Sequence, residues 1–305
     1  MPASEKHVAK VLAYLNENGE SKTLKKFEIK AETLSRYKRR KRFFETKNPK
    51  ILLLDIETAR MIFGGWGTGK QYVGHNQIIK DWFMLGWACK WIFEPDTKSD
   101  FVTGKEALLR DDSRICKSLW KLVNQADIII THNGNSFDIP KINTRFFLNG
   151  LPPPMSYQTI DTCRVGRKYF AFSSNALNYL GKLIVNKEKL HTSYQLWIDC
   201  ENGDQEQLDF MEEYCIGDTT LLEEVYLELR PWIKSHPNLA VLMDAQEQCC
   251  PNCGGFDFEE NGSYYTTPQN RYESVRCKSC GAVNRKRASV ITKDQRKVLL
   301  VPSAR

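Results

Sequence analysis

The sequence has 305 residues, which is more than a single hydrophobic core usually takes and favours two or three domains. No stretch approaches the roughly 20 apolar residues that a membrane-spanning helix needs, and Met1–Lys6 lacks the apolar core of a signal peptide. We therefore expect a soluble, intracellular protein with no membrane partner. We expect it in the cytoplasm. If the source organism has a nucleus or the protein is viral, the nucleus or a virus-infected cell is the alternative.

The formal net charge of +7 is unevenly distributed along the chain. Basic residues exceed acidic ones by 8 in residues 1–50 and by 5 in residues 249–305, whereas the middle has an acidic excess of 6. Basic ends suit a polyanion such as nucleic acid. Metal-binding carboxylates would contribute to the acidic excess of the middle segment.

The first fifty residues predict three short helices. Val8, Val11, Leu12 and Leu15 recur at helical spacing before Asn16–Gly19. Ser21 is expected to cap a second helix that ends at Phe27, and a third helix starts at Ala31. Three short helices of which the last is basic resemble a helix-turn-helix module, spanning residues 1–48.

In such modules the third helix enters the major groove of DNA. Thr33, Ser35, Arg36 and Arg39 are therefore candidate contacts, of which Arg36 and Arg39 are the main ones, and Lys38–Arg42 would contact phosphates. The alternative is a helical appendage with a solvated basic face, or a localisation signal.

Ile51–Leu54 is an unbroken apolar run, which predicts a strand buried in the middle of a sheet. Asp55 and Glu57 follow it two residues apart, so both side chains point to the same side of the strand. Two neighbouring carboxylates repel each other unless a cation lies between them. Hard divalent cations such as Mg²⁺ prefer this oxygen-only ligation.

The elements that follow alternate between strands and helices. We expect strands at Trp82–Phe93, Phe101–Thr103 and Asp127–Thr131, a strand or turn at Thr159–Cys163, and helices at Ser113–Gln125, from Asp138 onward, at Ser174–Leu183 and at Leu208–Ile233. Strands followed by covering helices predict an α/β domain with a mixed sheet.

Taken singly, the acidic residues have ordinary explanations. Asp138 suits a helix N-cap, and Asp55 and Glu57 suit an exposed strand end. Tyr214 and Asp218 suit one side of an amphipathic helix. It is their joint arrangement that indicates a site.

Asp-x-Glu lies at a strand end, Asn-x4-Asp at a strand-to-helix turn and Tyr-x3-Asp on a late helix. This order resembles the three exonuclease motifs of the DEDD superfamily of 3′–5′ exonucleases, which include the proofreading domains of DNA polymerases. The resemblance covers roughly residues 50–235, and Tyr214–Asp218 is most similar to the third motif of family B polymerases. Glu213 stands where the histidine branch has His, so the tyrosine branch (DEDDy) is favoured.

The resemblance implies a ribonuclease H-like 3′–5′ exonuclease domain over residues 49–238, with two Mg²⁺ or Mn²⁺ ions. Asp55, Glu57 and Asp218 would hold the ion next to the attacking water, and Asp55 with Asp138 would hold the second. Tyr214 would orient the water, because a tyrosine of ordinary pKa stays protonated at neutral pH.

Four further residues follow from the same resemblance. Thr58, next to Glu57, and Asn133, which matches the family asparagine, would contact the substrate. Phe137 could stack on a base, although a core position is equally compatible with its sequence context. Asp161 is expected to have a structural role and not to be a metal ligand.

The C-terminal residues 246–305 predict a zinc ribbon with a basic tail. Cys250-x2-Cys253 and Cys277-x2-Cys280 are separated by 23 residues and each pair is followed by glycine, which suits one structural Zn²⁺. The separation is slightly longer than in common ribbons, which a longer hairpin around Asn261–Ser263 would explain. A redox pair or unligated thiols are the alternative. Cys249 departs from the pattern and is not assigned. The remaining cysteines, Cys89, Cys116, Cys163, Cys200 and Cys215, are expected to be reduced and buried.

The ribbon also carries aromatic and basic residues that suit single-stranded nucleic acid. They are Phe256, Phe258, Tyr264, Tyr265, Tyr272, Arg271, Arg276, Arg285, Lys286 and Arg287. A protein partner is the alternative occupant, and some of these aromatic residues must form the ribbon's own core.

The sequence thus favours a metal-dependent 3′–5′ exonuclease with two accessory nucleic-acid-binding modules. The alternatives are an RNA 3′ exonuclease and a catalytically inactive nucleic-acid-binding regulatory protein. Usable residues at all five catalytic positions argue against inactivity, and the helix-turn-helix pattern favours DNA over RNA.

Overall fold

The computed structural model describes residues 5–31, 33, 34, 37, 49–67, 69, 70 and 72–300. The chain forms two units, one of residues Lys50–Leu229 and one of Met1–Pro49 together with Arg230–Arg305. The finer division into residues 1–48, 49–238 and 246–305 stays a prediction. In the part of the chain that the structure describes, no helix combines the length and apolar character that crossing a membrane would require.

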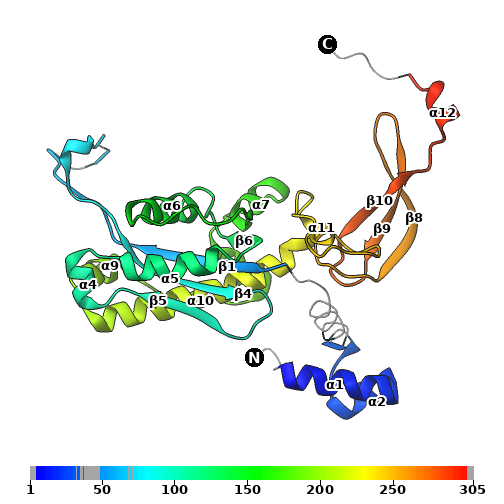
Figure 1. Cartoon of the computed structure of the whole chain (residues 1–305), viewed down its shortest axis with the longest axis horizontal. Helices are drawn as coiled ribbons and strands as arrows, with labels where there is room; N and C mark the ends of the chain where they lie inside the picture. Colours follow the sequence, from blue (N-terminus) through cyan, green and yellow to red (C-terminus); the bar gives the residue numbers. More distant parts are fainter. Residues whose placement is uncertain are drawn as a thin grey trace. The chain divides into compact units, whose positions relative to one another are not determined.

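The unit Lys50–Leu229 is built on a five-stranded mixed sheet (Figure 1). Its strands are β1 (Ile51–Thr58), β4 (Met84–Trp91), β5 (Thr97–Phe101), β6 (Ile128–Thr131) and β7 (Gln158–Asp161), in the order β5-β4-β1-β6-β7. β5, β4 and β1 pair antiparallel, whereas β1, β6 and β7 pair parallel. The predicted mixed α/β sheet is confirmed, and β1 is its central strand.

Helices pack around this sheet. They are α4 (Gly104–Leu109), α5 (Ser113–Val123), α6 (Asp138–Leu148), α7 (Thr162–Tyr169), α8 (Leu177–Leu180), α9 (Tyr194–Glu201) and α10 (Gln205–Leu229). The long helix α10 packs against β1, β4 and β5, and α5 packs against β4, β5 and α6. Leu52, Leu54 and Ile56 of β1 are buried in the same core as Ile115 and Leu119 of α5, and each such burial stabilises the fold by about 1.5–3 kcal/mol.

Two predicted strands differ from the structure. In Phe101–Thr103 only Phe101 is in a strand, because Thr103 begins a helix: its hydroxyl accepts the Glu106 N–H at 3.3 Å while Glu106 accepts the Thr103 N–H at 2.8 Å. Similarly, β7 ends at Asp161, whose carboxylate accepts the Arg164 N–H at 3.1 Å and caps α7.

Two predicted helices also have different bounds. The expected helix Ser174–Leu183 is a short α-helix, α8, that continues as a π-helical turn, η2 (Gly181–Val185). Helix α10 begins at Gln205 and its last turn tightens to a 3-10 turn, η3 (Arg230–Trp232), at Pro231, where proline lacks the N–H that an α-helix needs.

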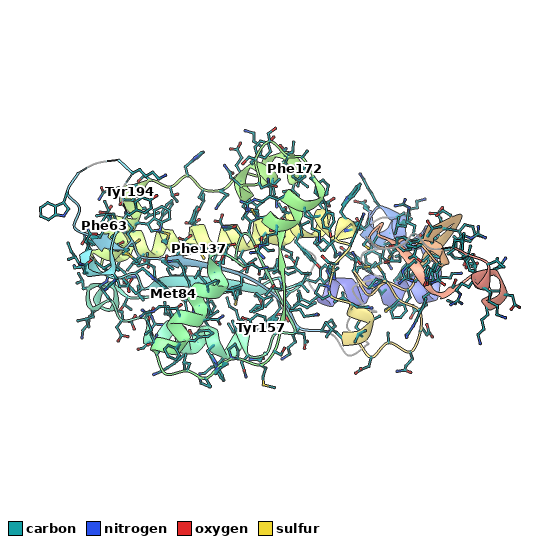
Figure 2. The ribbon with its side chains drawn as sticks, turned by 90° about the horizontal axis from the view of Figure 1, so that it is seen from above. Phe63, Met84, Phe137, Tyr157, Phe172 and Tyr194 are labelled. Carbon is teal, nitrogen blue, oxygen red and sulfur yellow. The ribbon has the colours of Figure 1, made fainter. Side chains whose placement is uncertain are left out.

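A small hairpin follows β1 and was not predicted. It consists of β2 (Ile62–Phe63), η1 (His75–Gln77) and β3 (Ile78–Lys80), and Phe63 is labelled in Figure 2. Its paired strands are too short to show an alternating apolar pattern.

The N-terminal residues form α1 (Glu5–Asn18) and α2 (Glu20–Phe27). Val11, Leu12 and Leu34 are buried together. The expected cap at Ser21 is wrong: Gly19, with φ 78°, precedes the helix, so Ser21 lies inside its first turn. Ala31, Thr33, Leu34 and Tyr37 are helical, whereas Ser35, Arg36 and Lys38–Arg42, Arg39 among them, lie outside the described residues.

The C-terminal residues contain α11 (Leu239–Leu242), an antiparallel sheet of β8 (Phe258–Thr266), β9 (Arg271–Cys277) and β10 (Val283–Ser289), and α12 (Lys293–Lys297). We expected the hairpin turn near Asn261–Ser263, but those residues lie within β8. The strands instead reverse at residues 267–270, where the Thr267 N–H donates to the Asn270 carbonyl at 2.8 Å.

Candidate active site

Three carboxylates meet where β1 faces α10. Asp55 and Glu57 point to the same side of β1, and Asp218 lies on α10, where it is 4% exposed. One carboxylate oxygen from each of the three lies within 4.8 Å of the others. Residues 161 positions apart in the chain are thus brought together by packing of the late helix on the central strand.

Helix α10 carries two more side chains to this place. Tyr214 is one turn before Asp218, so the two share a face of the helix. Burial, followed by the Asp218 charge, raises the pKa of Tyr214 to about 12, so its hydroxyl keeps its proton. Cys215, which we expected only in the core, is buried and its thiol lies 3.4 Å from Asp55 Oδ2.

Asp138 reaches β1 from another direction. It is the first residue of α6, as predicted, and is 3% exposed. Asp138 Oδ1 accepts the backbone N–H of Ile56 at 3.2 Å. The Asp138 carboxylate, although it belongs to α6, therefore contacts β1 at the residue next to Asp55. Asp138 does not belong to the group of three oxygens within 4.8 Å.

Burial raises the pKa of all four carboxyl groups. The pKa of Glu57 rises to about 8 and that of Asp138 to about 7. Burial also raises the pKa of Asp55 and of Asp218, and the Asp138 charge adds to the effect on Asp55. Carboxylates held together in this way favour a bound cation, which relieves their repulsion.

Lys189 lies at the same cluster and was missed by sequence reasoning. Its ammonium group forms an ion pair with Asp218 and lies 4.7 Å from the centroid of the Tyr214 ring. Although burial opposes it, the Asp218 charge raises the pKa of Lys189, so this lysine stays charged. The segment before α9 has no periodic pattern, and nothing in the sequence marks Lys189 among its neighbouring lysines.

Two sequence-predicted substrate contacts are joined by a second lysine that we did not predict. Lys141 donates to Thr58 Oγ1 at 3.2 Å, and its ammonium group lies 4.9 Å from the centroid of the Phe137 ring and 3.9 Å from that of Trp82. Phe137, labelled in Figure 2, is 41% exposed and is therefore not a core residue. The spacing of Lys141 from Asp138, one helical turn, could have indicated it.

Asn133 lies in the tight loop between β6 and α6, with φ 65°. Asp161 accepts the backbone N–H groups of Asn133 and Asn135, at 2.9 and 3.2 Å, so its carboxylate fixes this loop, as expected of a structural residue. A side chain at Gly134 would come within 2.3 Å of Thr131 Oγ1, which only glycine avoids. The loop therefore delivers Asp138 to the site in a fixed position.

The donor set suits hard divalent cations. Asp55, Glu57 and Asp218 offer only carboxylate oxygens, the ligands that Mg²⁺ and Mn²⁺ prefer.

A second candidate metal centre lies in the ribbon. Cys250, Cys253, Cys277 and Cys280 have their sulfur atoms within 4.8 Å of one another. The two knuckles have the same geometry, with N–H groups of Gly254 and Gly281 donating to the carbonyls of Cys250 and Cys277 at 2.8 Å. Both glycines have positive φ. Four thiols suit tetrahedral Zn²⁺ with no open position for water. Cys249 is buried but outside the group.

The five-stranded mixed sheet with its covering helices defines the fold of this domain as ribonuclease H-like, and the three carboxylates gather on it. Residues 91–230 match the family model described as RNase_H superfamily. The match includes Asp138, Tyr214 and Asp218 and begins after β1, which carries Asp55 and Glu57. The expected ribonuclease H-like fold is thereby confirmed.

Solved structures match as well. The family B DNA polymerase from the hyperthermophilic archaeon Pyrobaculum calidifontis is 15% identical, with a TM-score of 0.44 over 60% of this chain and 25% of the polymerase chain. This chain therefore spans about a quarter of that polymerase. No curated protein matches the chain. The fold assignment rests on the sheet and the family model.

Proposed function

We propose that the central domain is a two-metal-ion 3′–5′ exonuclease that releases nucleotides from DNA 3′ ends. The observation that carries this proposal is the meeting of Asp55, Glu57 and Asp218, with ligand oxygens within 4.8 Å and Tyr214 one turn away. The tyrosine spacing and the buried position of Asp138 add support.

Asp55, Glu57 and Asp218 would hold one Mg²⁺ or Mn²⁺ ion, and Asp55 with Asp138 a second. Such ions, when bound, lower the pKa of the attacking water and stabilise the leaving 3′-oxygen. Tyr214 acts as a hydrogen-bonding group that positions the water and not as a base, because its pKa of about 12 keeps it protonated.

The substrate strand would lie across the groups that surround the carboxylates. Lys141 is poised to contact a phosphate, and Phe137, beside it and 41% exposed, presents a ring on which a base can stack. Thr58 and Asn133 would contact the terminal nucleotides from β1 and from the loop before α6.

The ribbon supplies an accessory nucleic-acid-binding surface in this proposal. Tyr265 and Tyr272 are cross-strand partners, and the Arg285 guanidinium lies 5.6 and 4.2 Å from their ring centroids. We name these three residues the Arg285 face. On the opposite face Lys286 forms ion pairs with Glu260 and Glu273, at 2.6 and 2.7 Å. These two carboxylates neutralise the positive charge of Lys286.

DNA is preferred to RNA in this proposal because of the helix-turn-helix-like pattern of residues 1–48, in which Arg36 and Arg39 would contact DNA. A protein partner at the ribbon stays a prediction.

Digestion of end-labelled oligonucleotides tests the proposal. With Mg²⁺ or Mn²⁺, a 5′-labelled DNA strand should shorten stepwise while the matching 3′-labelled strand releases its label in the first step. Asp55→Ala should abolish both signals. Faster digestion of RNA of the same sequence would show that RNA, and not DNA, is the preferred substrate. Shortening from the 5′ end would refute the assigned direction.

A further inference from the structure

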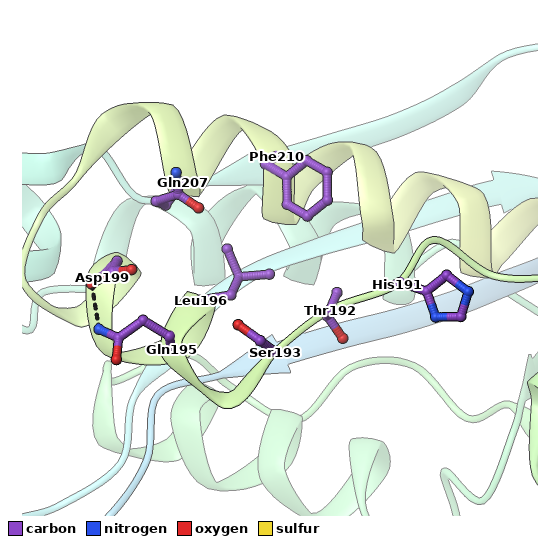
Figure 3. A pocket seen from close by; sticks show the side chains of 8 residues that line it. All are labelled: His191, Thr192, Ser193, Gln195, Leu196, Asp199, Gln207 and Phe210. Carbon is purple, nitrogen blue, oxygen red and sulfur yellow. Dashed lines mark hydrogen bonds between the residues drawn. The ribbon is translucent and has the colours of Figure 1, made fainter.

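A cleft formed by α9, α10 and the segment before α9 is lined by residues that the proposed reaction does not use (Figure 3). Leu196 and Phe210 are its apolar side chains, and Thr192, Ser193, Gln195 and Gln207 supply polar groups. Its volume is about 340 Å³, which falls within the range of pockets that hold small organic groups. We name it the Phe210 cleft.

Three segments connect the Phe210 cleft to the carboxylates. Phe210, Tyr214 and Asp218 follow one another at four-residue intervals on a single face of α10, so the ring lies two turns, or roughly 12 Å along the axis, from the acid. Leu196 lies on α9, which packs against α10, the helix that carries Asp218. The cleft is therefore built from the same elements as the candidate active site.

The third connection is the segment before α9. Lys189, which pairs with Asp218, stands two residues before His191, the first residue that lines the cleft. This segment therefore runs from the carboxylates to the cleft.

The chemistry of the cleft matches a nucleobase. Phe210 is 36% exposed, so its ring offers a face for stacking. The amide groups of Gln195 and Gln207 both donate and accept hydrogen bonds, as a base edge requires. Gln195 is held in place by its hydrogen bond to Asp199 at 2.8 Å, drawn in Figure 3.

We propose that the Phe210 cleft holds an unpaired nucleobase of the strand being digested, near the scissile bond. This inference rests on the proposed exonuclease function and adds a subsite to it. A base can enter the cleft only when it has left its partner strand.

Binding of abasic oligonucleotides to the full-length protein tests the subsite. Single strands of roughly ten nucleotides carry one abasic residue, moved stepwise through the 3′-terminal positions, and fluorescence anisotropy gives each Kd with Ca²⁺ in place of Mg²⁺. Wild-type protein should bind one of these strands about 5- to 100-fold more weakly than the intact strand, the effect expected of one lost stacking contact.

Phe210→Ala should weaken binding of the intact strand by a similar factor and should no longer distinguish the intact strand from that abasic strand. Such non-additivity identifies two groups that touch each other. Phe210→Tyr, which keeps the ring, should behave like wild type. Phe147→Ala provides the matched control, because Phe147 lies on α6 and is 80% exposed.

Two results would overturn the subsite. The first is that wild-type protein binds every abasic strand with the same Kd as the intact strand. This result requires no variant. The second is the same abasic penalty in Phe210→Ala as in wild type. Because these are binding measurements, they are separate from the exonuclease proposal, which fails if no oligonucleotide is digested with Mg²⁺ or Mn²⁺.

Discussion

The Lys189 ammonium group forms an ion pair with the Asp218 carboxylate and lies 4.7 Å from the centroid of the Tyr214 ring. Asp218 and Tyr214 form the Tyr-x3-Asp motif on α10, whereas Lys189 comes from an irregular segment before α9. Lys189 therefore places a fixed positive charge beside the group that is proposed to position the attacking water. Negative charge that develops at phosphorus would be stabilised by such a charge.

Replacement of Lys189 by methionine should lower the rate of nucleotide release roughly 100-fold, as the loss of a preorganised cation does in other sites. Initial rates at saturating substrate measure this. Lys187→Met is the matched control, since Lys187 lies in the same segment and pairs with Glu224 at the surface. Equal rates for Lys189→Met and wild type would exclude a role for this charge in the reaction.

The stability of the metal-free protein should decrease as pH rises. Glu57 and Asp138 have folded-state pKa values of about 8 and 7, above the ordinary values of 4.5 and 3.8. A raised pKa contributes stability that is complete below the unfolded-state value and is lost as pH rises through the folded-state value. Thermal unfolding in chelator should therefore give a lower Tm at about pH 8 than at about pH 5.

Addition of Mg²⁺ should raise Tm more at the higher pH, because the cation binds only the ionised carboxylates. For a domain of this size each kcal/mol corresponds to roughly 2–4 °C. Glu57→Gln should weaken both effects. A metal-free Tm that does not change between these two pH values would contradict the assigned electrostatics.

The structure separates the cysteines that should bind zinc from their neighbour. Cys250→Ala should lower the zinc content well below one ion per chain, because a tetrahedral site with three thiolates loses affinity. Cys249→Ala should keep the full ion, since Cys249 lies outside the group of four sulfur atoms. Metal analysis of the purified variants measures this, and equal zinc loss in both would place Cys249 among the ligands.

The two faces of the ribbon sheet allow a matched test of nucleic-acid binding. Tyr272→Ala with Arg285→Ala removes the Arg285 face, and Tyr264→Ala with Arg271→Ala removes the equivalent pair on the other face, where Arg271 lies 4.6 Å from the Tyr264 ring centroid. Loss of stacking should weaken single-strand binding about 5- to 100-fold in the first variant only. Equal losses in the two variants would show that the ribbon binds without a preferred face.

Sequence reasoning was most successful where a pattern is local. The apolar run Ile51–Leu54 predicted the central strand, and Asp138 opens a helix as expected. The four-residue spacing of Tyr214 and Asp218 predicted their common face on α10. In each case the decisive signal lies within one element, where the strand or helix period fixes the direction of the side chains.

The features that were missed depend on contacts between distant segments. Lys189 gains its role from Asp218 on another element, and Lys141 from Thr58 at the end of β1. Helix α9 has only eight residues and little amphipathic character, so its position against α10 follows from tertiary packing. The turn expected near Gly262 fell inside β8 because glycine also occurs at strand irregularities.

Anomalous diffraction from crystals soaked in Mn²⁺ tests the central claim most directly. The proposed site predicts two manganese peaks in wild-type protein, one between Asp55, Glu57 and Asp218 and one beside Asp55 and Asp138. Asp138→Asn should weaken the second peak and leave the first. A wild-type map with strong peaks elsewhere and none at these carboxylates would contradict a two-metal nuclease site.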